Sequence, residues 1–430
     1  MSEKLANWAG NVTFSAERFH RPSSRPELQR LVSQARQVRA LGSGHSFNRL
    51  ADTPGDLVTV AGLPRVIEVD TAKSAVTVSA SLTYREVSAA LNQAGRALRN
   101  LASLPHISVA GACATGTHGS GDGNGNLATS VSAVEMVTAD GDVVTASRDR
   151  DPGRFPGVVL ALGALGIVTH LTLDTVPAFD VQQYVYEDLP YQQVSEHFEE
   201  IVSSAYSVSL FTDWRSPRFR QAWLKHRAGV AGAWAPEPRW MGGRLADGAR
   251  NPVPGMPAAN CTEQLGVPGP WHERLPHFRP DFTPSAGDEL QSEYLVPRAS
   301  AIAALHAVAP IAGQLAPVVQ ISEIRTIAAD DLWLSPSYRR DTVAFHFTWI
   351  RDWAAVAPVV AQVEERLAPL QARPHWGKLF AMSPGTVRGA YPRLDDFQQL
   401  MRAYDPAGKF RNDLIDRYFP ADRLTRKGPA

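Results

Sequence analysis

The residues best suited to ligand chemistry begin in a short glycine loop near the N-terminus. The loop reads Leu41-Gly42-Ser43-Gly44-His45-Ser46-Phe47-Asn48. Glycines one residue apart let the backbone approach a ligand closely and expose consecutive N–H groups to it. Such a nest suits the pyrophosphate of a dinucleotide. A tight turn after a strand, with His45 on the surface, explains the same spacing, so the loop by itself leaves both interpretations open.

A second stretch, residues 103–125, is rich in small side chains and hydroxyls. It begins Ser103-Leu-Pro-His106-Ile-Ser108-Val-Ala-Gly111-Ala112-Cys113-Ala114-Thr115 and continues through five more glycines. Small residues over this length would let a cofactor lie flat against the backbone. A flexible glycine linker is the alternative. It is disfavoured because the stretch also contains Val, Ala and Thr and lies between structured segments.

Two pairs of polar residues lie in the C-terminal half, in runs where residue types alternate. Glu323 and Arg325 are two residues apart, and so are His346 and Thr348. Side chains two apart on a strand share a face, so each pair could line a polar pocket for a ligand with several hydroxyls. An exposed, salt-bridged sheet face is the alternative, and the pattern by itself favours it. The segment ending at Lys378, His-Trp-Gly-Lys, reads alone as a polar loop.

Several common chemistries lack a matching motif in the sequence. Neither glycine stretch shows G-x-G-x-x-G in a β-α-β context, so a nicotinamide-binding Rossmann fold is disfavoured. There is no P-loop, no G-x-S-x-G and no H-E-x-x-H. The spacing of His272 and His277 across a proline is poor for a metal. Two cysteines, Cys113 and Cys261, exclude a disulfide framework, and we expect no metal site.

The composition is that of a neutral globular chain. It has 430 residues, with 43 Lys and Arg against 43 Asp and Glu. A net charge of zero disfavours a nucleic-acid partner, which normally requires a basic excess or patch. The longest apolar run, near residues 158–168, is interrupted by glycines and is too short to span a bilayer. Because residues 1–10 contain no apolar signal segment, we expect a cytoplasmic protein without a membrane contact.

The elements that would position these residues read, over the first 175 positions, as helices mixed with short strands. Apolar residues at helical spacing between Pro26 and Leu41 predict an amphipathic helix. Thr83 and Glu86 form a capping box that opens a second helix, which ends near Gly95. β-branched runs predict strands at 57–60, 66–70, 75–78, 131–138, 143–147 and 166–173, with the hairpin signal Asp-Gly before residue 142.

After Pro177 the residue pattern of the sequence changes, which indicates a domain boundary. Strands are predicted at 206–213, 318–326 and 342–350. A helix is predicted over 300–315, where Pro310 should kink it or end it early. Another is predicted over 356–367, whose valines share a face. The proline-rich stretch 236–270 has no period and predicts a large irregular loop or a set of short connections.

Taken together, these stretches resemble the alditol oxidase (xylitol oxidase) family of the vanillyl-alcohol oxidase / p-cresol methylhydroxylase FAD flavoprotein superfamily. The matching segments are 7–11, 41–48, 102–111, 114–121, 206–213, 260–264, 268–276, 323–326 and 374–378. Glu-x-Arg and His-Trp-x-Lys are shared with aldonolactone oxidases, so the C-terminal region resembles that of a sugar-1,4-lactone oxidase. Asn-Cys-Thr-Glu-Gln at 260–264 points to the alditol branch. Residues 231–250 match poorly.

The resemblance implies an α+β, two-domain FAD-binding fold. Residues 1–178, joined by the C-terminal segment of about 376–430, would form the FAD-binding domain, and residues 179–375 a substrate-binding cap. His45 falls where the family carries a histidine bonded covalently to the flavin. The other cofactor-binding positions would be Leu41, Gly42, Ser43, Gly44, Ser46, Ser103, Ser108, Gly111, Ala112, Cys113, Ala114, Thr115 and Ile167. The substrate-binding positions would be Ser103, Glu323, Arg325, Thr348 and Lys378.

The implied reaction is oxidation of the primary alcohol of an alditol to the aldose, with reduction of O2 to H2O2. Xylitol, sorbitol and similar polyols would be substrates, and glycerol a weak one. Glu323 and Arg325 would bind substrate hydroxyls as acceptor and donor. Lys378 would stabilise developing negative charge, and His346 is the best candidate base; Lys378, His346 and Arg325 are thus the predicted catalytic residues. We expect a monomer whose partners are a small polyol and O2. An aldonolactone oxidase or dehydrogenase on the same fold, and a non-catalytic flavin- or sugar-binding protein, remain alternatives.

Overall fold

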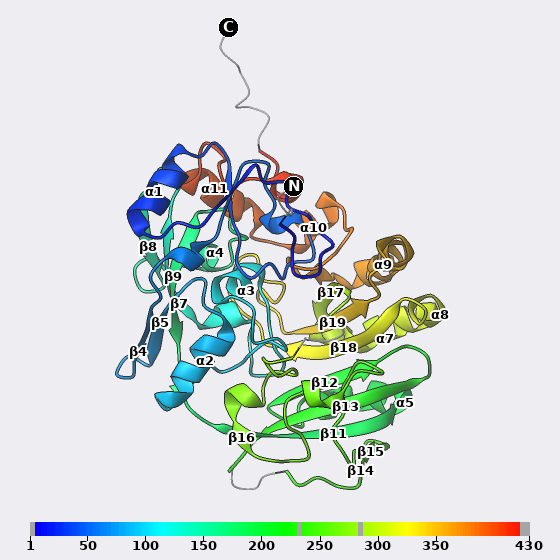
Figure 1. The fold of residues 1–430 in the computed structure, drawn as a ribbon. Coiled ribbons are helices and arrows are strands. Elements are labelled where there is room, and N and C mark those ends of the chain that lie inside the picture. Colours follow the sequence, from blue (N-terminus) through cyan, green and yellow to red (C-terminus); the bar gives the residue numbers. More distant parts are fainter. Residues whose placement is uncertain (1–4, 230–233, 283–286, 422–430) are drawn as a thin grey trace.

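The computed structural model describes residues 5–229, 234–282 and 287–421. Residues 1–4, at the start of the expected first domain, residues 231–233 of the poorly matching stretch and residues 422–430 of the predicted C-terminal segment lie outside these ranges. Figure 1 shows the elements of the first 175 residues gathered in one part of the molecule, and a large sheet built from later residues in the other. No helix among the described residues is long and apolar enough to cross a membrane.

The glycine loop follows directly on a small parallel sheet. Its strands are β1 (Arg18–His20), β3 (Asp56–Val58) and β2 (Val38–Ala40), in the order β1-β3-β2. Helix α1 (Arg25–Gln34) begins at Ser24, whose side chain accepts from the Glu27 N–H. The predicted helix over 26–41 is therefore too long. Val38 fits the helical spacing but pairs with Asp56 in the sheet and donates its N–H to the Lys409 carbonyl, so tertiary pairing overrides the local pattern.

A five-stranded antiparallel sheet supports the second small-residue stretch. Its order is β4 (Ile67–Asp70), β5 (Ala75–Ser79), β9 (Ile167–Asp174), β7 (Val131–Val137), β8 (Val143–Ser147). The predicted hairpin is confirmed, with Gly141 at φ 88° in its turn. The capping box of Thr83 and Glu86 is also confirmed, at the start of α2 (Tyr84–Gln93). The remaining elements here are β6 (Arg96–Ala97), α3 (Val109–Thr115), α4 (Phe155–Val159) and β10 (Val176–Pro177).

A ten-stranded sheet is built from residues 180–374. Its strands are β11 (Asp180–Pro190), β12 (Ser207–Thr212), β13 (Arg218–Arg227), β14 (Arg239–Trp240), β15 (Gly243–Leu245), β16 (Gly269–Pro270), β17 (Leu290–Pro297), β18 (Val319–Ile327), β19 (Thr342–Trp349) and β20 (Arg373–Pro374). The central order is β11-β13-β12-β18-β19-β17. β12, β18 and β19 confirm the predicted strands, whereas β11, β13 and β17 were not predicted.

Helices cover one face of this sheet. They are α5 (Tyr191–Glu196), α6 (Phe198–Val202), α7 (Ala301–Val308), α8 (Ala312–Leu315) and α9 (Trp353–Leu367). The predicted break at Pro310 is confirmed, since a 3-10 turn separates α7 from α8. On β17, Tyr294 points toward α9, where its hydroxyl donates to Glu364 at 2.8 Å. The alternate residues of β17, β18 and β19 therefore face the other way, toward the N-terminal part.

The C-terminal helices return to the first part of the chain. They are α10 (Pro384–Ala390), α11 (Leu394–Tyr404) and α12 (Asp413–Tyr418), and α11 packs beside α4 (Figure 1). The Asn412 side chain donates to the carbonyls of Arg49, Leu50 and Asp52 at 3.1, 3.0 and 2.8 Å. We propose the domain division at residues 178 and 375 on this basis: the large sheet lies between these limits, and the segments on either side of it bind each other.

Candidate active site

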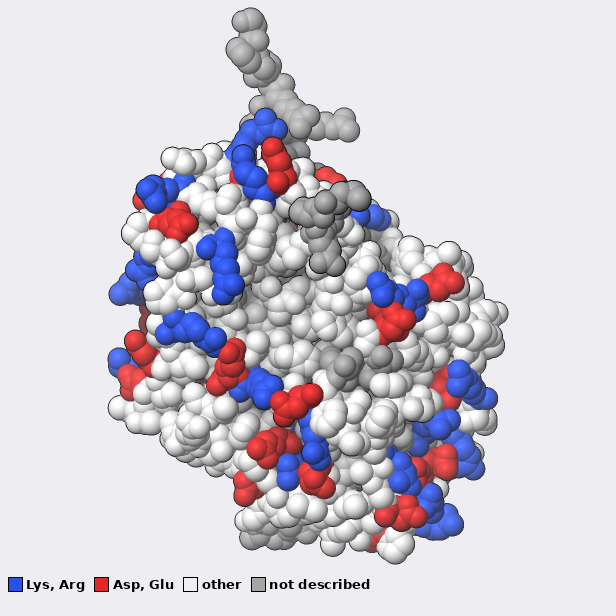
Figure 2. All heavy atoms as spheres, in the orientation of Figure 1, with Lys and Arg blue, Asp and Glu red and all other residues white. Residues whose placement is uncertain are grey.

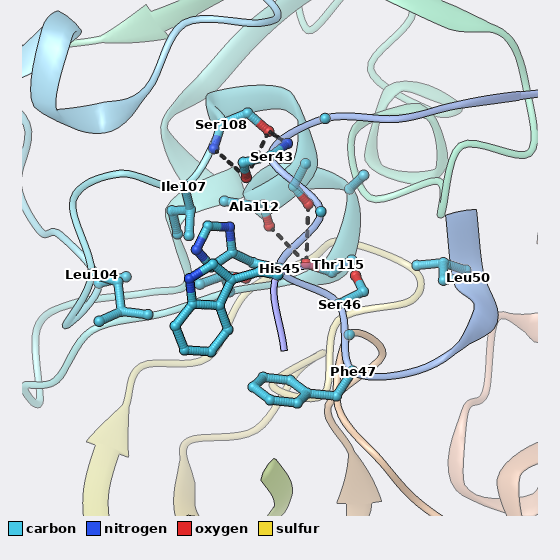
Figure 3. A pocket seen from close by; sticks show the side chains of 18 of the residues that line it. Ser43, His45, Ser46, Phe47, Leu50, Leu104, Ile107, Ser108, Ala112 and Thr115 are labelled. Carbon is cyan, nitrogen blue, oxygen red and sulfur yellow. Dashed lines mark hydrogen bonds between the residues drawn. The ribbon is translucent and has the colours of Figure 1, made fainter. Parts of the chain in front are cut away.

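A cavity of about 480 Å³ lies between the N-terminal part and the uncovered face of the large sheet. Its lining includes the glycine loop, many residues between Ser103 and Thr117, and side chains of β17, β18 and β19. Figure 3 shows the end of the cavity that the glycine loop lines, with the side chains of His45 and Ile107 among its lining residues. On the outer face drawn in Figure 2, charged groups of both signs are interspersed, and neither sign forms a continuous patch.

The glycine loop is fixed by both ends of the chain. From the N-terminal side, Asn7 Nδ2 donates to the Ser46 carbonyl at 2.9 Å, and the Trp8 N–H donates to the Gly44 carbonyl at 2.9 Å. From the C-terminal side, Asn48 Nδ2 donates to the carbonyls of Trp376 and Lys378, each at 2.8 Å. The predicted glycine loop and the predicted His-Trp-Gly-Lys loop are therefore neighbours, although more than 300 residues separate them.

Ser108 lies close to Gly42 and to Gly111, and its hydroxyl explains why both positions carry glycine. The Ser43 N–H donates to Ser108 Oγ at 3.3 Å, and the Ser108 N–H donates to Ser43 Oγ at 3.0 Å. A Cβ at Gly42 would lie 2.5 Å from Ser108 Oγ, and a Cβ at Gly111 would lie 2.7 Å from it. Figure 3 shows the paired serines above the cavity. Each serine hydroxyl thus bonds the backbone of the other loop, and small residues of both loops line the cavity.

His45 is a polar residue of this wall whose hydrogen bonding is incomplete. Both of its ring nitrogens are buried, and neither has a hydrogen-bond partner among the described residues. The ring stacks on Trp8 with centroids 5.2 Å apart and lies 5.5 Å from the ring of His106. Burial lowers the pKa of His45 to about 3, and His106 and Lys378 act in the same direction. The imidazole is therefore neutral, with a free lone pair at the cavity.

These observations fit FAD. A bound dinucleotide would supply partners to the unpaired buried nitrogens and would lie against the wall of small residues. Most of the predicted cofactor positions line the cavity: Leu41, Gly42, Ser43, Gly44, His45, Ser46, Ser103, Ser108, Gly111, Ala112, Ala114 and Thr115. These residues would hold the cofactor.

Two predicted cofactor positions are placed differently. The side chains of Cys113 and Ile167 do not line the cavity within the described structure. The helical period of α3 turns Cys113 away, so that its Sγ contacts Tyr84 Oη at 3.5 Å. Ile167 packs in a separate core with Phe410, because alternation along β9 leaves its neighbours Gly166 and Val168 to face the cavity.

At the large sheet, the cavity is lined by polar residues that form rows across neighbouring strands. Glu323 of β18 lies opposite His346 of β19, which in turn lies opposite Glu293 of β17. In the next row, Thr348 lies opposite Gln291. The predicted pairs Glu323/Arg325 and His346/Thr348 therefore share one face. All four are less than a tenth exposed, so the alternative of an exposed salt-bridged face is wrong.

Buried charges in these rows compensate one another. His277 Nε2 lies 2.7 Å from Glu323 Oε1, and Arg325 Nη2 donates to Glu293 Oε1 at 2.8 Å. Burial alone would raise the pKa of Glu323, yet the charges of Arg325 and His277 hold it well below its usual range. Arg325 also donates to Ser103 Oγ at 3.3 Å, which joins the charged face to the cofactor-binding stretch.

Lys378 and His346 lie at the junction of the two halves of the cavity. The Lys378 ammonium contacts Gln291 Oε1 and lies 5.0 Å from the ring centroid of Phe47. Burial lowers the pKa of Lys378 to about 8, although Glu293 and Glu289 oppose the shift. His346 Nε2 lies 3.2 Å from Thr348 Oγ1, and burial lowers the pKa of His346 as well.

Sequence reasoning missed several residues of the site. Glu293 and Gln291 line the cavity from β17, and His277, which had been considered only as a metal ligand, contacts Glu323. Gln291 and Glu293 repeat the two-residue spacing of the predicted pairs, so they could have been found had β17 been recognised. His277 follows a proline-rich irregular segment, where no period indicates which side chains point inward.

The fold and the site together define a class of protein. A cradle that fits a dinucleotide opens onto a buried polar pocket suited to a hydroxylated ligand. A family model described as "FAD binding domain" matches residues 16–147, and one described as "D-arabinono-1,4-lactone oxidase" matches residues 288–418. The protein is an FAD-dependent oxidoreductase.

Similarity over the whole length identifies the family. The alditol oxidase of Streptomyces sp. (strain IKD472 / FERM P-14339) is 52% identical over 97% of this chain and 100% of its own length. The L-gulono-1,4-lactone dehydrogenase of Mycobacterium tuberculosis (strain ATCC 25618 / H37Rv) is 29% identical over 97% of this chain and 99% of its own. This chain belongs to the alditol oxidase family.

Solved structures show the fold. A structure titled "Solvent-stable cholesterol oxidase" aligns over 97% of both chains with a TM-score of 0.79 at 16% identity. The cholesterol oxidase from B. sterolicum aligns over 97% of this chain and 96% of its own with a TM-score of 0.77 at 14% identity. The predicted α+β fold of the vanillyl-alcohol oxidase / p-cresol methylhydroxylase type is confirmed.

The packing around Ser108 predicts that Gly42→Ala loses cofactor. The new methyl group would displace Ser108 Oγ from its bonds with Ser43, and overpacking of this kind costs about 1–3 kcal/mol. We therefore expect roughly tenfold weaker FAD binding, measured by titrating FAD into apoprotein that also carries His45→Ala, so that no covalent link can retain the flavin. Gly389→Ala in the same background is the control, because a Cβ at Gly389 meets nothing within 4 Å. An unchanged Kd for FAD in the Gly42→Ala protein would show that this cradle does not hold the cofactor.

Proposed function

We propose that the protein oxidises the primary alcohol of alditols such as xylitol and sorbitol to the aldose, using FAD attached covalently to His45 and producing H2O2 from O2. The observation that carries the proposal is the buried polar face of β17, β18 and β19, which opens onto the same cavity as the unpaired His45 ring. The similarity to an alditol oxidase supports the choice of substrate class. The lower similarity to a lactone dehydrogenase keeps aldonolactones as the alternative.

Substrate binding follows from the chemistry of the two strands. When bound, FAD supplies the two-electron oxidation and passes the electrons to O2. Glu323, ionised, can only accept hydrogen bonds, and the Arg325 guanidinium can only donate them. A polyol hydroxyl does both, so neighbouring hydroxyls can meet the two groups in turn. Thr348 and Ser103 add further hydroxyl partners at either side of the pocket.

His346 and Lys378 act on the substrate proton and on the negative charge that its loss leaves. His346 accepts the proton of the reacting hydroxyl, because its buried imidazole is neutral near pH 7 and offers a lone pair. Lys378, protonated below a pKa of about 8, stabilises the negative charge that develops on the oxygen as the proton leaves. Both side chains line the cavity between the substrate-binding strands and the glycine loop. We therefore assign catalysis to Lys378, His346 and Arg325.

A covalent link at His45 predicts flavin that survives denaturation. Wild-type protein should show a fluorescent band under ultraviolet light on an acid-fixed denaturing gel. His45→Ala should bind FAD but release all of it on denaturation, because the nucleophilic nitrogen is absent. His272→Ala, a histidine outside the cavity lining, is the control and should keep the band. Complete loss of flavin from denatured wild-type protein would exclude the covalent link.

The pocket predicts a strong preference for polyols. Removing a hydroxyl that the site pairs leaves buried charged groups unsatisfied, and the specificity loss can reach about four orders of magnitude. In a peroxide-coupled assay, xylitol and sorbitol should exceed glycerol in kcat/KM and greatly exceed butanol. L-gulono-1,4-lactone tests the alternative function. Equal rates with butanol and xylitol would overturn the polyol assignment, and a preference for the lactone would replace it.

Lys378 and Glu323 should differ in their kinetic effects. Lys378→Met should lower the limiting rate of anaerobic flavin bleaching by xylitol by roughly two to three orders of magnitude, because it removes a preorganised charge. Glu323→Gln keeps the shape and should act chiefly on KM. Since the protonated lysine is the active form, wild-type kcat/KM should fall as pH rises through about 8. The Lys378→Met variant should not show this decrease at high pH. If Lys378→Met bleaches at the wild-type rate, the lysine takes no part in the mechanism.

A further inference from the structure

Glu293 lies at the centre of the charged face and is the only one of its carboxylates that touches the candidate base, within the part of the chain that the structure describes. It is 2% exposed and lies directly opposite His346 in the β17–β19 register. Its Oε2 atom is 3.5 Å from His346 Nδ1. Its Oε1 atom is 2.8 Å from Arg325 Nη2 and 3.3 Å from His118 Nε2. One carboxylate therefore faces the proton acceptor on one side, and the Arg325 guanidinium and the His118 ring on the other.

We propose that Glu293 is a positioning residue: it holds His346 in the tautomer whose Nε2 atom is free to take the substrate proton. The inference rests on the proposed function. A carboxylate can only accept hydrogen bonds, so the nitrogen that faces it must carry the hydrogen. That places the hydrogen on Nδ1 and leaves the lone pair on Nε2. The 3.5 Å distance is long for a hydrogen bond, as catalytic contacts often are before substrate binds.

The lone pair on Nε2 points to a route for the proton. Thr348 Oγ1, at 3.2 Å, can donate its hydrogen to Nε2 and accept one from the substrate hydroxyl. The substrate O–H bond breaks, an N–H bond forms on Nε2, and the O–H electron pair stays on oxygen to become part of the new carbonyl. The C–H bond breaks as well, and its hydrogen leaves together with both electrons to FAD, the oxidant already proposed. His346 becomes a cation, and the Glu293 charge stabilises it.

The other charges around His346 cannot replace Glu293. From β18 it is faced by Glu323 and Arg325, and from the loop after β20 by His375 and Lys378. Glu323 is engaged with His277 at 2.7 Å. Burial, Lys378 and Arg325 all lower the pKa of His346, and Glu293 opposes them. Loss of the Glu293 charge would therefore leave a weaker base.

Glu293→Gln separates this role from simple packing. Arg325 can only donate, so the new amide oxygen would turn to it and the amide NH2 group would face His346 Nδ1. The histidine would then have to carry its hydrogen on Nε2, the wrong tautomer. Glu293→Asp retains the charge on a shorter side chain and should rescue part of the activity. Glu364→Gln is the matched control: Glu364 is also buried, but it bonds Tyr294 and the Ala381 N–H on the helix-covered face.

Two measurements test the proposal. In anaerobic bleaching by xylitol between pH 5 and 9, Glu293→Gln should react about a hundredfold more slowly, with its acid limb moved to lower pH, while Glu364→Gln follows wild type. In holoenzyme carrying isotope-labelled histidine, the His346 signals, assigned by their absence in His346→Gln, should report hydrogen on Nδ1 in wild type and on Nε2 in Glu293→Gln.

The two measurements also separate the proposal from the function on which it rests. A wild-type protein that xylitol does not bleach would reject the alditol reaction, while the histidine spectrum, recorded without substrate, would still test Glu293. An unchanged tautomer in Glu293→Gln would overturn the positioning role. A wild-type rate and acid limb in that variant would overturn it as well. If Glu293→Gln does not fold, Glu293→Asp must show a reduced rate with the wild-type tautomer, and a wild-type rate there would reject the proposal.

Discussion

Glu293 and Glu323 lie on one buried face of a sheet, and Arg325 lies between them, 2.8 Å from the first and 3.5 Å from the second. Burying a carboxylate is costly unless a cation and hydrogen bonds replace its water. Here one arginine compensates both carboxylates, and histidines contact the carboxylates on their outer sides. Removal of any one member would leave another charge uncompensated. The charges therefore have fixed positions before any ligand arrives, which is the condition for strong electrostatic effects in catalysis.

The same burial requires a second layer over the charged face, and the N-terminal part supplies it. The glycine loop is bonded to residues 376–378, and Ser103 accepts from Arg325. The cradle for the cofactor and the polar pocket are thus held at a fixed separation by bonds that join the two halves of the cavity. An enzyme that oxidises one carbon of a flexible polyol depends on such a separation, since reacting atoms must be held within about 3–3.5 Å.

The fold does not decide the substrate. Cholesterol oxidases share it at TM-scores of 0.77 and 0.79, with 14% and 16% identity. Function resides in the residues that a fold presents, and the assignment here comes from named side chains on three strands and from similarity at 52% identity over the full length. The face that the large sheet turns toward the glycine loop carries buried charged residues.

The sequence by itself determined the local elements and the chemistry of single motifs. The capping box at Thr83, the hairpin at Gly141, the break at Pro310 and strands β18 and β19 all depend on neighbours within a few residues, and all were predictable. Strand β17, with buried Gln, Ser and Glu, shows no alternation and was not. Only the tertiary structure placed Glu293 beside His346 and buried the pairs that alternation favoured as exposed. Which face of a strand loses water depends on what packs against it, and here that partner lies hundreds of residues away in the chain.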